Sequence, residues 1–159
     1  MADRDKETEL PGDVDEMMDA DRQAAQFERV RNAQQTEKAE DYVEMIDDLI
    51  KAYGEARVTD LAQRFGVSHA TVNKIVKRLQ RDGLVTSRPY RSIFLTEQGS
   101  ALADASRKRH QIVLNFLRAI GVSARNAELD AEGIEHYVST ETLAAFEKIT
   151  SEKDGSENR

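Results

Sequence analysis

The chain contains no cysteine, which excludes disulfides, zinc fingers, iron–sulfur clusters and thiol catalysis. No apolar run approaches the roughly 20 residues that a membrane helix needs, and the first residues hold no apolar segment typical of a secretory signal. A cytoplasmic protein without a membrane partner is therefore expected. The net charge of -7 excludes a basic surface over the whole protein. Nucleic-acid binding would have to come from a local patch.

Charge is distributed unevenly along the 159 residues. Residues 1–40 hold 12 acidic and 6 basic side chains, which favours a flexible acidic arm, although residues 20–38 could form a helix without a convincing apolar stripe. From Arg64 to Arg91 the balance of charge reverses: this segment contains seven Lys or Arg residues and a single acid, Asp82. A solvated helix face is the ordinary explanation of such a run, and a nucleic-acid-binding patch is the alternative.

Apolar spacing predicts three helices ahead of a hairpin. The first runs from about Glu37 to Tyr53, and a shorter one covers 58–65 and ends at Gly66, where a left-handed residue costs least. Ser68 then supplies an N-cap oxygen for a third helix, which closes near residue 82. Two short helices joined by a tight glycine-containing turn form a helix-turn-helix. The apolar stripe of the first helix consists of Tyr42, Ile46, Leu49, Ile50 and Tyr53.

The polar face of the third helix has the composition of a DNA recognition helix. Small residues can approach base edges, asparagine can read adenine, and lysine can contact phosphate or guanine. Residues 84–86 and 92–96 favour two strands, and the turn between them would be the wing of a winged helix, with arginines placed to meet phosphate or the minor groove. A small α+β domain that binds protein is the alternative. The candidate DNA-contacting residues are Ser68, His69, Ala70, Thr71, Asn73, Lys74, Lys77, Arg88 and Arg91.

The last third of the chain is also predicted to be helical. A long helix over about 96–120 is followed by further helical sequence, and a polar tail closes the chain. These helices supply more apolar surface than one small domain needs, which predicts association into a homodimer. The apolar stripe of the long helix consists of Leu102, Ala105, Val113, Phe116, Leu117 and Ile120.

Two acidic pairs at helical spacing and two of the three histidines make a plausible set of ligands for a divalent metal. Residues spaced i, i+3 and i+4 share one helix face, and oxygen ligands with one or two imidazoles suit Mn²⁺ or Fe²⁺. A cation would also relieve the repulsion between clustered acids. From spacing alone, solvated pairs remain the stronger explanation, because Asp47, Asp48, Glu128 and Asp130 fit equally well. The candidate metal ligands are Asp41, Glu44, His110, Glu132, Glu135 and His136.

Five segments resemble the manganese-dependent transport regulators of the diphtheria-toxin-repressor family. They span about residues 40–145 in order, and the last two are the specific ones because winged helices in general lack them. The segments are EDYVEMIDDLI (40–50), ARVTDLAQRFGVSHATVNKIVKRLQRDGLV (56–85), FLTEQG (94–99), RHQIVLNFL (109–117) and DAEGIEHYVS (130–139).

The resemblance implies a mainly α fold with a small β-wing. A flexible arm (1–36) would precede a winged helix-turn-helix DNA-binding domain (37–98), a helical dimerisation and metal-binding domain (99–150) and a polar tail (151–159). The arm exceeds what compact manganese sensors have, and the chain is too short for the SH3-like domain of longer iron-dependent members. The resemblance gives the arm no role.

The resemblance also implies two Mn²⁺ ions per chain at the junction of the two domains. The family's ligands fall on the six candidates above, and Glu44, Glu132 and Glu135 would be shared or bridging. Iron-sensing relatives have a methionine where this chain has Asp41, and a hard carboxylate there favours Mn²⁺. Tyr137 replaces a second histidine of some members but is not among the ligands.

The expected function is Mn²⁺-responsive regulation of transcription by a homodimer on a palindromic operator of double-stranded DNA. Repression of manganese-uptake genes is the expected outcome, and activation of an efflux gene is the alternative. A winged-helix regulator that senses a small molecule would bind DNA indifferently to Mn²⁺. A binuclear metallohydrolase is a further rival, but no additional base or nucleophile lies beside the ligands and the recognition helix would be unexplained. We therefore expect no enzyme.

Overall fold

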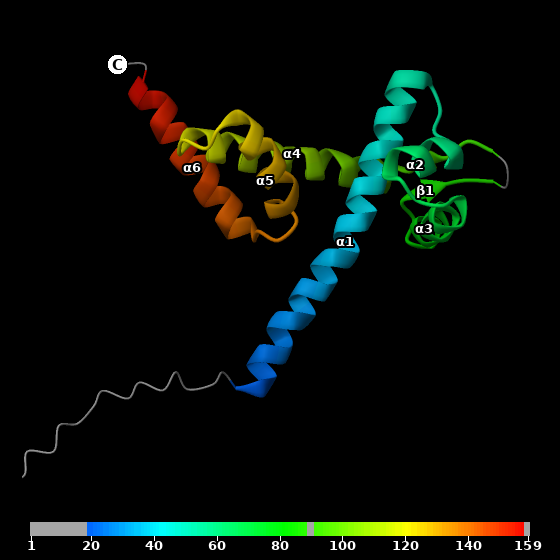
Figure 1. Ribbon diagram of the computed structural model, residues 1–159, viewed down its shortest axis with the longest axis horizontal. Helices are drawn as coiled ribbons and strands as arrows, with labels where there is room; N and C mark the ends of the chain where they lie inside the picture. Colours follow the sequence, from blue (N-terminus) through cyan, green and yellow to red (C-terminus); the bar gives the residue numbers. More distant parts are fainter. Residues whose placement is uncertain (1–18, 89–90, 158–159) are drawn as a thin grey trace, which may run out of the picture.

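The computed structural model describes residues 19–88 and 91–157, which form a mainly helical protein with one two-stranded antiparallel sheet (Figure 1). This arrangement confirms the predicted fold class. The elements in chain order are α1 (Ala20–Tyr53), α2 (Val58–Phe65), α3 (His69–Arg81), β1 (Val85–Thr86), β2 (Phe94–Leu95), α4 (Glu97–Ala119), α5 (Ala124–Ile134) and α6 (Thr140–Glu157).

The helix-turn-helix forms where the sequence predicts it. Gly66 ends α2 in the left-handed conformation with a φ of 64°, which a glycine adopts without steric cost. The Ser68 hydroxyl then accepts a hydrogen bond from the Thr71 backbone N–H at 3.1 Å and caps α3. The short turn between these two signals sets the angle at which α3 leaves α2. It thereby places the polar face of α3 on the outside of the protein.

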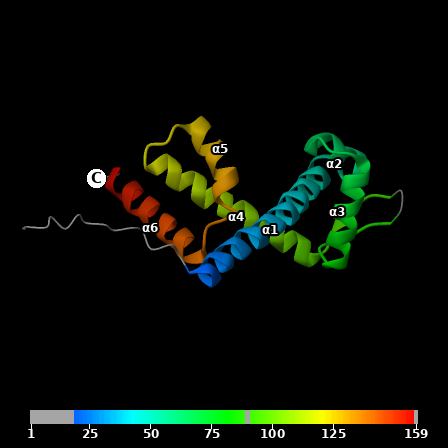
Figure 2. The same ribbon diagram turned by 60° about the horizontal axis from the view of Figure 1, so that its bottom comes forward.

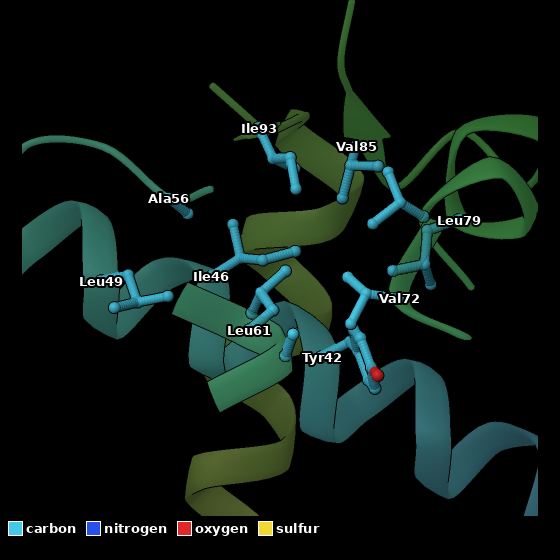
Figure 3. Packing of buried hydrophobic residues seen from close by; sticks show 11 residues of the cluster. Tyr42, Ile46, Leu49, Ala56, Leu61, Val72, Leu79, Val85 and Ile93 are labelled. Carbon is cyan, nitrogen blue, oxygen red and sulfur yellow. The ribbon is translucent and has the colours of Figure 1, made fainter. Parts of the chain in front are cut away.

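One apolar core joins α1 to the winged helix (Figure 3). Ile46 of α1, Leu61 of α2 and Val72 of α3 are fully buried, and Val85 of β1 and Ile93 beside β2 close the cluster. Burying such a side chain contributes about 1.5–3 kcal/mol. Because α1 supplies part of this core, the positions of α1 and α3 are coupled by packing.

A second core lies in the C-terminal half. Val113 and Leu117 of α4 pack with Ala127 and Ala131 of α5, and Phe116 stacks on Phe146 of α6. Figures 1 and 2 show α4 running from the winged helix into this second unit. No helix of the described residues is both long enough and apolar enough to cross a membrane.

Two helices are longer than the sequence predicts. The first helix begins at Ala20 instead of Glu37, so residues 20–36 of the expected arm are helical, and Asp19 caps the start through the Arg22 N–H. Residues 1–18 of that arm lie outside the described residues. The last helix continues to Glu157, so most of the expected tail belongs to α6. Neither extension has a strong apolar stripe, which is why periodicity alone did not indicate them.

Three members of the predicted apolar stripes are more exposed than expected. Tyr53 is 69 % exposed and lies under the guanidinium of Arg64, and Ile120 at the end of α4 is 49 % exposed. Ala105 is exposed as well, whereas its neighbour Ser106 is buried. The first half of α4 therefore buries a face one position away from the predicted stripe.

Candidate metal centre and nucleic-acid interface

The six candidate metal ligands come from three elements that lie together: α1, α4 and the end of α5. Asp41 and Glu44 lie about one turn apart on α1, and His110 lies in the middle of α4. Glu132 lies in the last turn of α5, and Glu135 and His136 follow the last residue of that helix. The N-terminal half and the C-terminal half thus both contribute to one cluster.

His110 faces the acidic end of α5. Its Nδ1 lies 3.5 Å from Glu132 Oε1 and 3.5 Å from Glu135 Oε2. One ligand atom from each of these three side chains lies within 4.8 Å of the other two, which is close enough for all three to surround one cation. Glu135 is buried, whereas Glu132 is mostly exposed, so this group has one closed and one open side.

His136 faces α1 instead. Its Nε2 lies 3.6 Å from Asp41 Oδ1 and 3.5 Å from Glu135 Oε1. Glu135 therefore contacts both imidazoles, one with each carboxylate oxygen. This carboxylate connects the α4 side of the cluster to the α1 side.

Burial and mutual repulsion disfavour the ionised forms of these acids. Burial raises the pKa of Glu135 to about 7, and the charges of Glu132 and Glu44 add to this effect against the opposing histidines. Burial also raises the pKa of Asp41 to about 6, opposed by His136 and aided by neighbouring acids that include Glu44. The charge of Glu44 therefore acts on both Glu135 and Asp41.

The cluster has the chemistry of a site for a divalent cation. Glu135 Oε2 is buried and has no hydrogen-bond partner, which is costly for a carboxylate oxygen. Four carboxylates and two imidazoles offer the mixed oxygen and nitrogen ligands that Mn²⁺ and Fe²⁺ accept. A cation bound here would satisfy the unpaired oxygen and offset the repulsion, so the residues fit such an ion.

Other acids that fit the spacing equally well have other partners. Asp47 and Asp48 on the next turns of α1 each lie 2.6 Å from a guanidinium nitrogen of Arg107 on α4. Arg107 also donates to the Glu44 carbonyl at 3.4 Å. These contacts hold α1 against α4 just beyond the cluster and leave Asp47 and Asp48 as structural acids.

The sequence did not single out Glu40 or Arg109, and it named Glu128 only as one of several acids that fit the spacing equally well. Glu40 accepts a hydrogen bond from His136 Nδ1 at 2.8 Å and forms an ion pair with Arg109. Glu128 lies 3.5 Å from His110 Nε2. The only signal for Glu40 was its place next to Asp41, and with 30 acidic residues in the chain that signal decided nothing.

The candidate DNA-contacting residues lie on one side of the winged helix. All six named on α3 and its start, from Ser68 to Lys74, are exposed, as is Lys77. His69, Asn73 and Lys77 line a groove together with Arg88 and Arg91 of the wing. The basic run therefore forms a surface between α3 and the wing, although the wing tip at 89–90 lies outside the described residues.

Further side chains shape this groove and were not predicted. Gln80 donates from Nε2 to the Ser87 carbonyl at 2.7 Å and ties the wing to α3. Arg57, at the start of α2, adds another cation to the lining. The Ser68 hydroxyl lies 2.9 Å from the Thr71 hydroxyl and caps the helix, so it already has partners within the protein.

The chain matches two adjacent domains of one protein family. Residues 34–93 match the N-terminal DNA binding domain of iron dependent repressors, and residues 96–153 match their metal binding and dimerisation domain. Transcriptional regulator MntR of Escherichia coli O6:H1 is 50 % identical over 137 residues, which are 86 % of this chain and 88 % of that protein. HTH-type transcriptional regulator MntR of Geobacillus kaustophilus is 40 % identical over 104 residues, which are 65 % of this chain and 74 % of that protein.

The fold is shared with a solved metalloregulator. A manganese-dependent transcriptional repressor in complex with manganese has a TM-score of 0.63 and 28 % identity, over 71 % of this chain and 52 % of that longer one. These similarities confirm the resemblance that the sequence segments indicated. Since both halves of the sequence match in order, the chain belongs to the iron dependent repressor family of DNA-binding regulators.

Proposed function

We propose that this protein is a Mn²⁺-responsive repressor that binds two Mn²⁺ ions per chain and, as a homodimer, recognises a palindromic operator. Repression of manganese-uptake genes when manganese is sufficient is the proposed outcome. The six ligands would be the cluster from α1, α4 and the end of α5. The observation that carries this proposal is that Asp41 of the N-terminal half lies 3.6 Å from His136 of the C-terminal half, whose Nε2 also lies 3.5 Å from the buried Glu135. The other oxygen of Glu135, Oε2, has no hydrogen-bond partner, and Glu135 forms a group with His110 and Glu132 that could hold a cation.

The chemistry that a bound divalent cation supplies here is neutralisation of the carboxylates and simultaneous coordination of groups from both halves. The protein's own residues determine what that coordination does. Asp41 and Glu44 share α1 with Tyr42 and Ile46, which pack in the core of the winged helix. A fixed position for the two acids relative to α5 therefore fixes the position of α3. In a homodimer, this would set the separation of the two recognition helices.

The choice of Mn²⁺ rests on the donor set. Four carboxylates with two imidazoles and no sulfur ligand favour a hard cation. Asp41 supplies an oxygen where iron-sensing relatives have a methionine. Similarity to regulators named MntR and to the manganese-bound repressor supports the same choice. Since later transition metals bind most sites more tightly, selectivity would come from this geometry and from metal availability.

The proposal is tested by titrating metal-stripped protein with Mn²⁺ in a calorimeter and by selecting DNA from a random library with and without Mn²⁺. We expect two ions per chain and enrichment of a palindromic sequence only when Mn²⁺ is present. Equal enrichment in Mn²⁺ and in chelator would contradict the proposed metal response. It would favour a winged-helix regulator that responds to another signal.

Replacing Lys74 or Arg91 with alanine should weaken binding to the selected DNA and reduce its salt dependence. Each lost phosphate contact lowers the slope of log K against log salt by about one, because one fewer counterion is released. The measurement is fluorescence anisotropy of labelled DNA between about 50 and 200 mM salt. Lys148→Ala, an exposed lysine of α6, is the matched control and should leave the slope unchanged. An unchanged slope in Arg91→Ala would remove that arginine from the interface.

A further inference from the structure

Glu40 is a buried carboxylate that belongs to none of the six candidate ligands. Its side chain is 3 % exposed, and the imidazole of His136 that it contacts is 2 % exposed. The two lie 96 residues apart in the sequence, since Glu40 is on α1 and His136 follows α5. A contact this deep between distant segments demands complementary chemistry on both sides.

Both oxygens of Glu40 are used. Oε2 lies 2.8 Å from His136 Nδ1, and Oε1 forms an ion pair with the Arg109 guanidinium on α4. Arg109 is the residue before His110, so the same turn of α4 carries a candidate ligand and the cation that holds Glu40. The Glu40 carboxylate therefore connects α1, α4 and the end of α5 next to the metal cluster.

The contact with Glu40 determines which nitrogen of His136 is free. A neutral imidazole carries one N–H and one lone pair, and a carboxylate can only accept a hydrogen bond. Glu40 therefore keeps the proton on Nδ1 and leaves the lone pair on Nε2. That nitrogen is the one that lies 3.6 Å from Asp41 and 3.5 Å from Glu135, on the side of the cluster.

We propose that Glu40, held by Arg109, is a positioning residue for the metal centre: it fixes the tautomer and the ring orientation of His136, so that Nε2 is presented to the ion. The inference rests on the proposed metal response. Partners of this kind on the second nitrogen of a ligating histidine typically change metal affinity by about ten- to a hundredfold. Glu40 itself would not be a ligand, because both of its oxygens already have partners in the protein.

Glu128 provides an internal comparison. It also approaches a histidine of the cluster, since Oε2 lies 3.5 Å from His110 Nε2, but its side chain is 62 % exposed. A longer contact at an exposed position constrains the ring less, because water can replace the carboxylate. The two glutamates thus differ in burial and in distance while sharing their chemistry.

The first test is the Mn²⁺ affinity of Glu40→Gln, measured from the free-Mn²⁺ signal in electron paramagnetic resonance. The amide keeps the shape of the side chain but can donate as well as accept, so it no longer enforces the tautomer. We expect the affinity to fall about ten- to a hundredfold, while Glu128→Gln changes it less than threefold. The same affinity in Glu40→Gln and in the unmodified protein would overturn the proposal, even if the variant unfolds at a lower temperature.

The second test needs neither metal nor a variant. Nitrogen-15 correlation spectra of the metal-free protein at pH 8.5 report which ring nitrogen of His136 carries the proton. We expect the proton on Nδ1, and a ring protonated only on Nε2 would overturn the proposal even if Glu40→Gln fails to fold. Failure of the unmodified protein to bind Mn²⁺ would instead reject the proposed function. Normal Mn²⁺ binding with an unchanged Glu40→Gln affinity would reject only the role of Glu40.

Discussion

Glu135→Ala should abolish the proposed Mn²⁺-dependent increase in DNA affinity, while the metal-free protein still folds. Glu135 contacts both candidate histidines, with Oε2 3.5 Å from His110 and Oε1 3.5 Å from His136. Its removal therefore separates the two sides of the cluster. Operator binding with and without Mn²⁺ measures the effect. Full Mn²⁺-dependent binding in Glu135→Ala would contradict the assignment of the site, and Glu128→Ala is the control that should retain the response.

Glu135→Ala should also change how the stability of the protein depends on pH. Burial raises the pKa of Glu135 to about 7 in the folded protein, whereas an unfolded chain has a glutamate pKa near 4.3. Between these two values the folded state binds a proton that the unfolded state has lost. The contribution of Glu135 to stability is therefore full below about pH 4 and falls as the pH rises towards 7.

Alanine at position 135 removes this loss of stability at higher pH but also leaves a cavity that destabilises the protein. The sign of the change in unfolding free energy at a single pH therefore does not identify the cause. The difference in unfolding free energy between Glu135→Ala and the unmodified protein should shift in favour of the variant between pH 5 and pH 7.5. Urea titrations in chelator at both values measure it. A difference that does not change with pH would mean that Glu135 is not a buried, repelled carboxylate. Mn²⁺ itself should stabilise only the unmodified protein.

The helix-turn-helix was predictable because local signals agree with the fold. Gly66 ends one helix, Ser68 begins the next, and the apolar positions of α3 alternate with its exposed polar face. Each of these signals acts within a few residues, so no distant contact is needed to recognise them. The wing strands follow from β-branched and aromatic residues in the same way.

The two helix extensions were not predictable on those grounds. Residues 20–36 of α1 expose both Phe27 and Val30, so no buried face produces a periodic pattern there. Asp19 does cap the helix, but Asp and Asn precede many segments that do not become helices. Amphipathic periodicity reveals helices that bury one face against the protein. It does not reveal helical turns that are exposed to solvent on all sides.

The cluster of candidate ligands was only partly predictable. Spacing alone placed Glu132, Glu135 and His136 on one face, but nothing local indicated that this face meets α1 and His110. That step came from the resemblance to a known family. Spacing also could not separate Asp41 from Asp47, which differ because Arg107 pairs with Asp47 while Asp41 lies beside His136. Glu40 needed the three-dimensional contact to be noticed at all.

The junction between the wing and α4 is the other place where a single substitution should have a large effect. Gly99 is buried in the first turn of α4, and its N–H donates to the Thr96 hydroxyl at 3.1 Å. Thr96 in turn donates from its backbone N–H to the Leu84 carbonyl at 3.0 Å and from its hydroxyl to the Gly83 carbonyl at 2.6 Å. The start of α4 is thereby held against the end of the helix-turn-helix.

Gly99→Ala should destabilise the protein because there is no room for a methyl group. A Cβ at this position would lie 2.0 Å from the Leu84 carbonyl oxygen, which belongs to backbone and cannot rotate away. Overpacking of this kind costs about 1–3 kcal/mol or more, and it outweighs the gain of up to about 1 kcal/mol that alanine brings to a helix. Displacement of Leu84 would also move β1 and weaken DNA binding.

Gly133→Ala is the matched control for this prediction. Gly133 lies in α5, and a Cβ there would meet nothing within 4 Å. The same substitution should therefore be neutral or stabilise the metal-free protein by up to about 1 kcal/mol, because only the helix propensity changes. Urea unfolding of both variants at equal protein concentration separates the two effects. If Gly99→Ala were as stable as Gly133→Ala, the close packing of α4 against Leu84 would be wrong, and with it the rigid connection between the wing and the helix that carries His110.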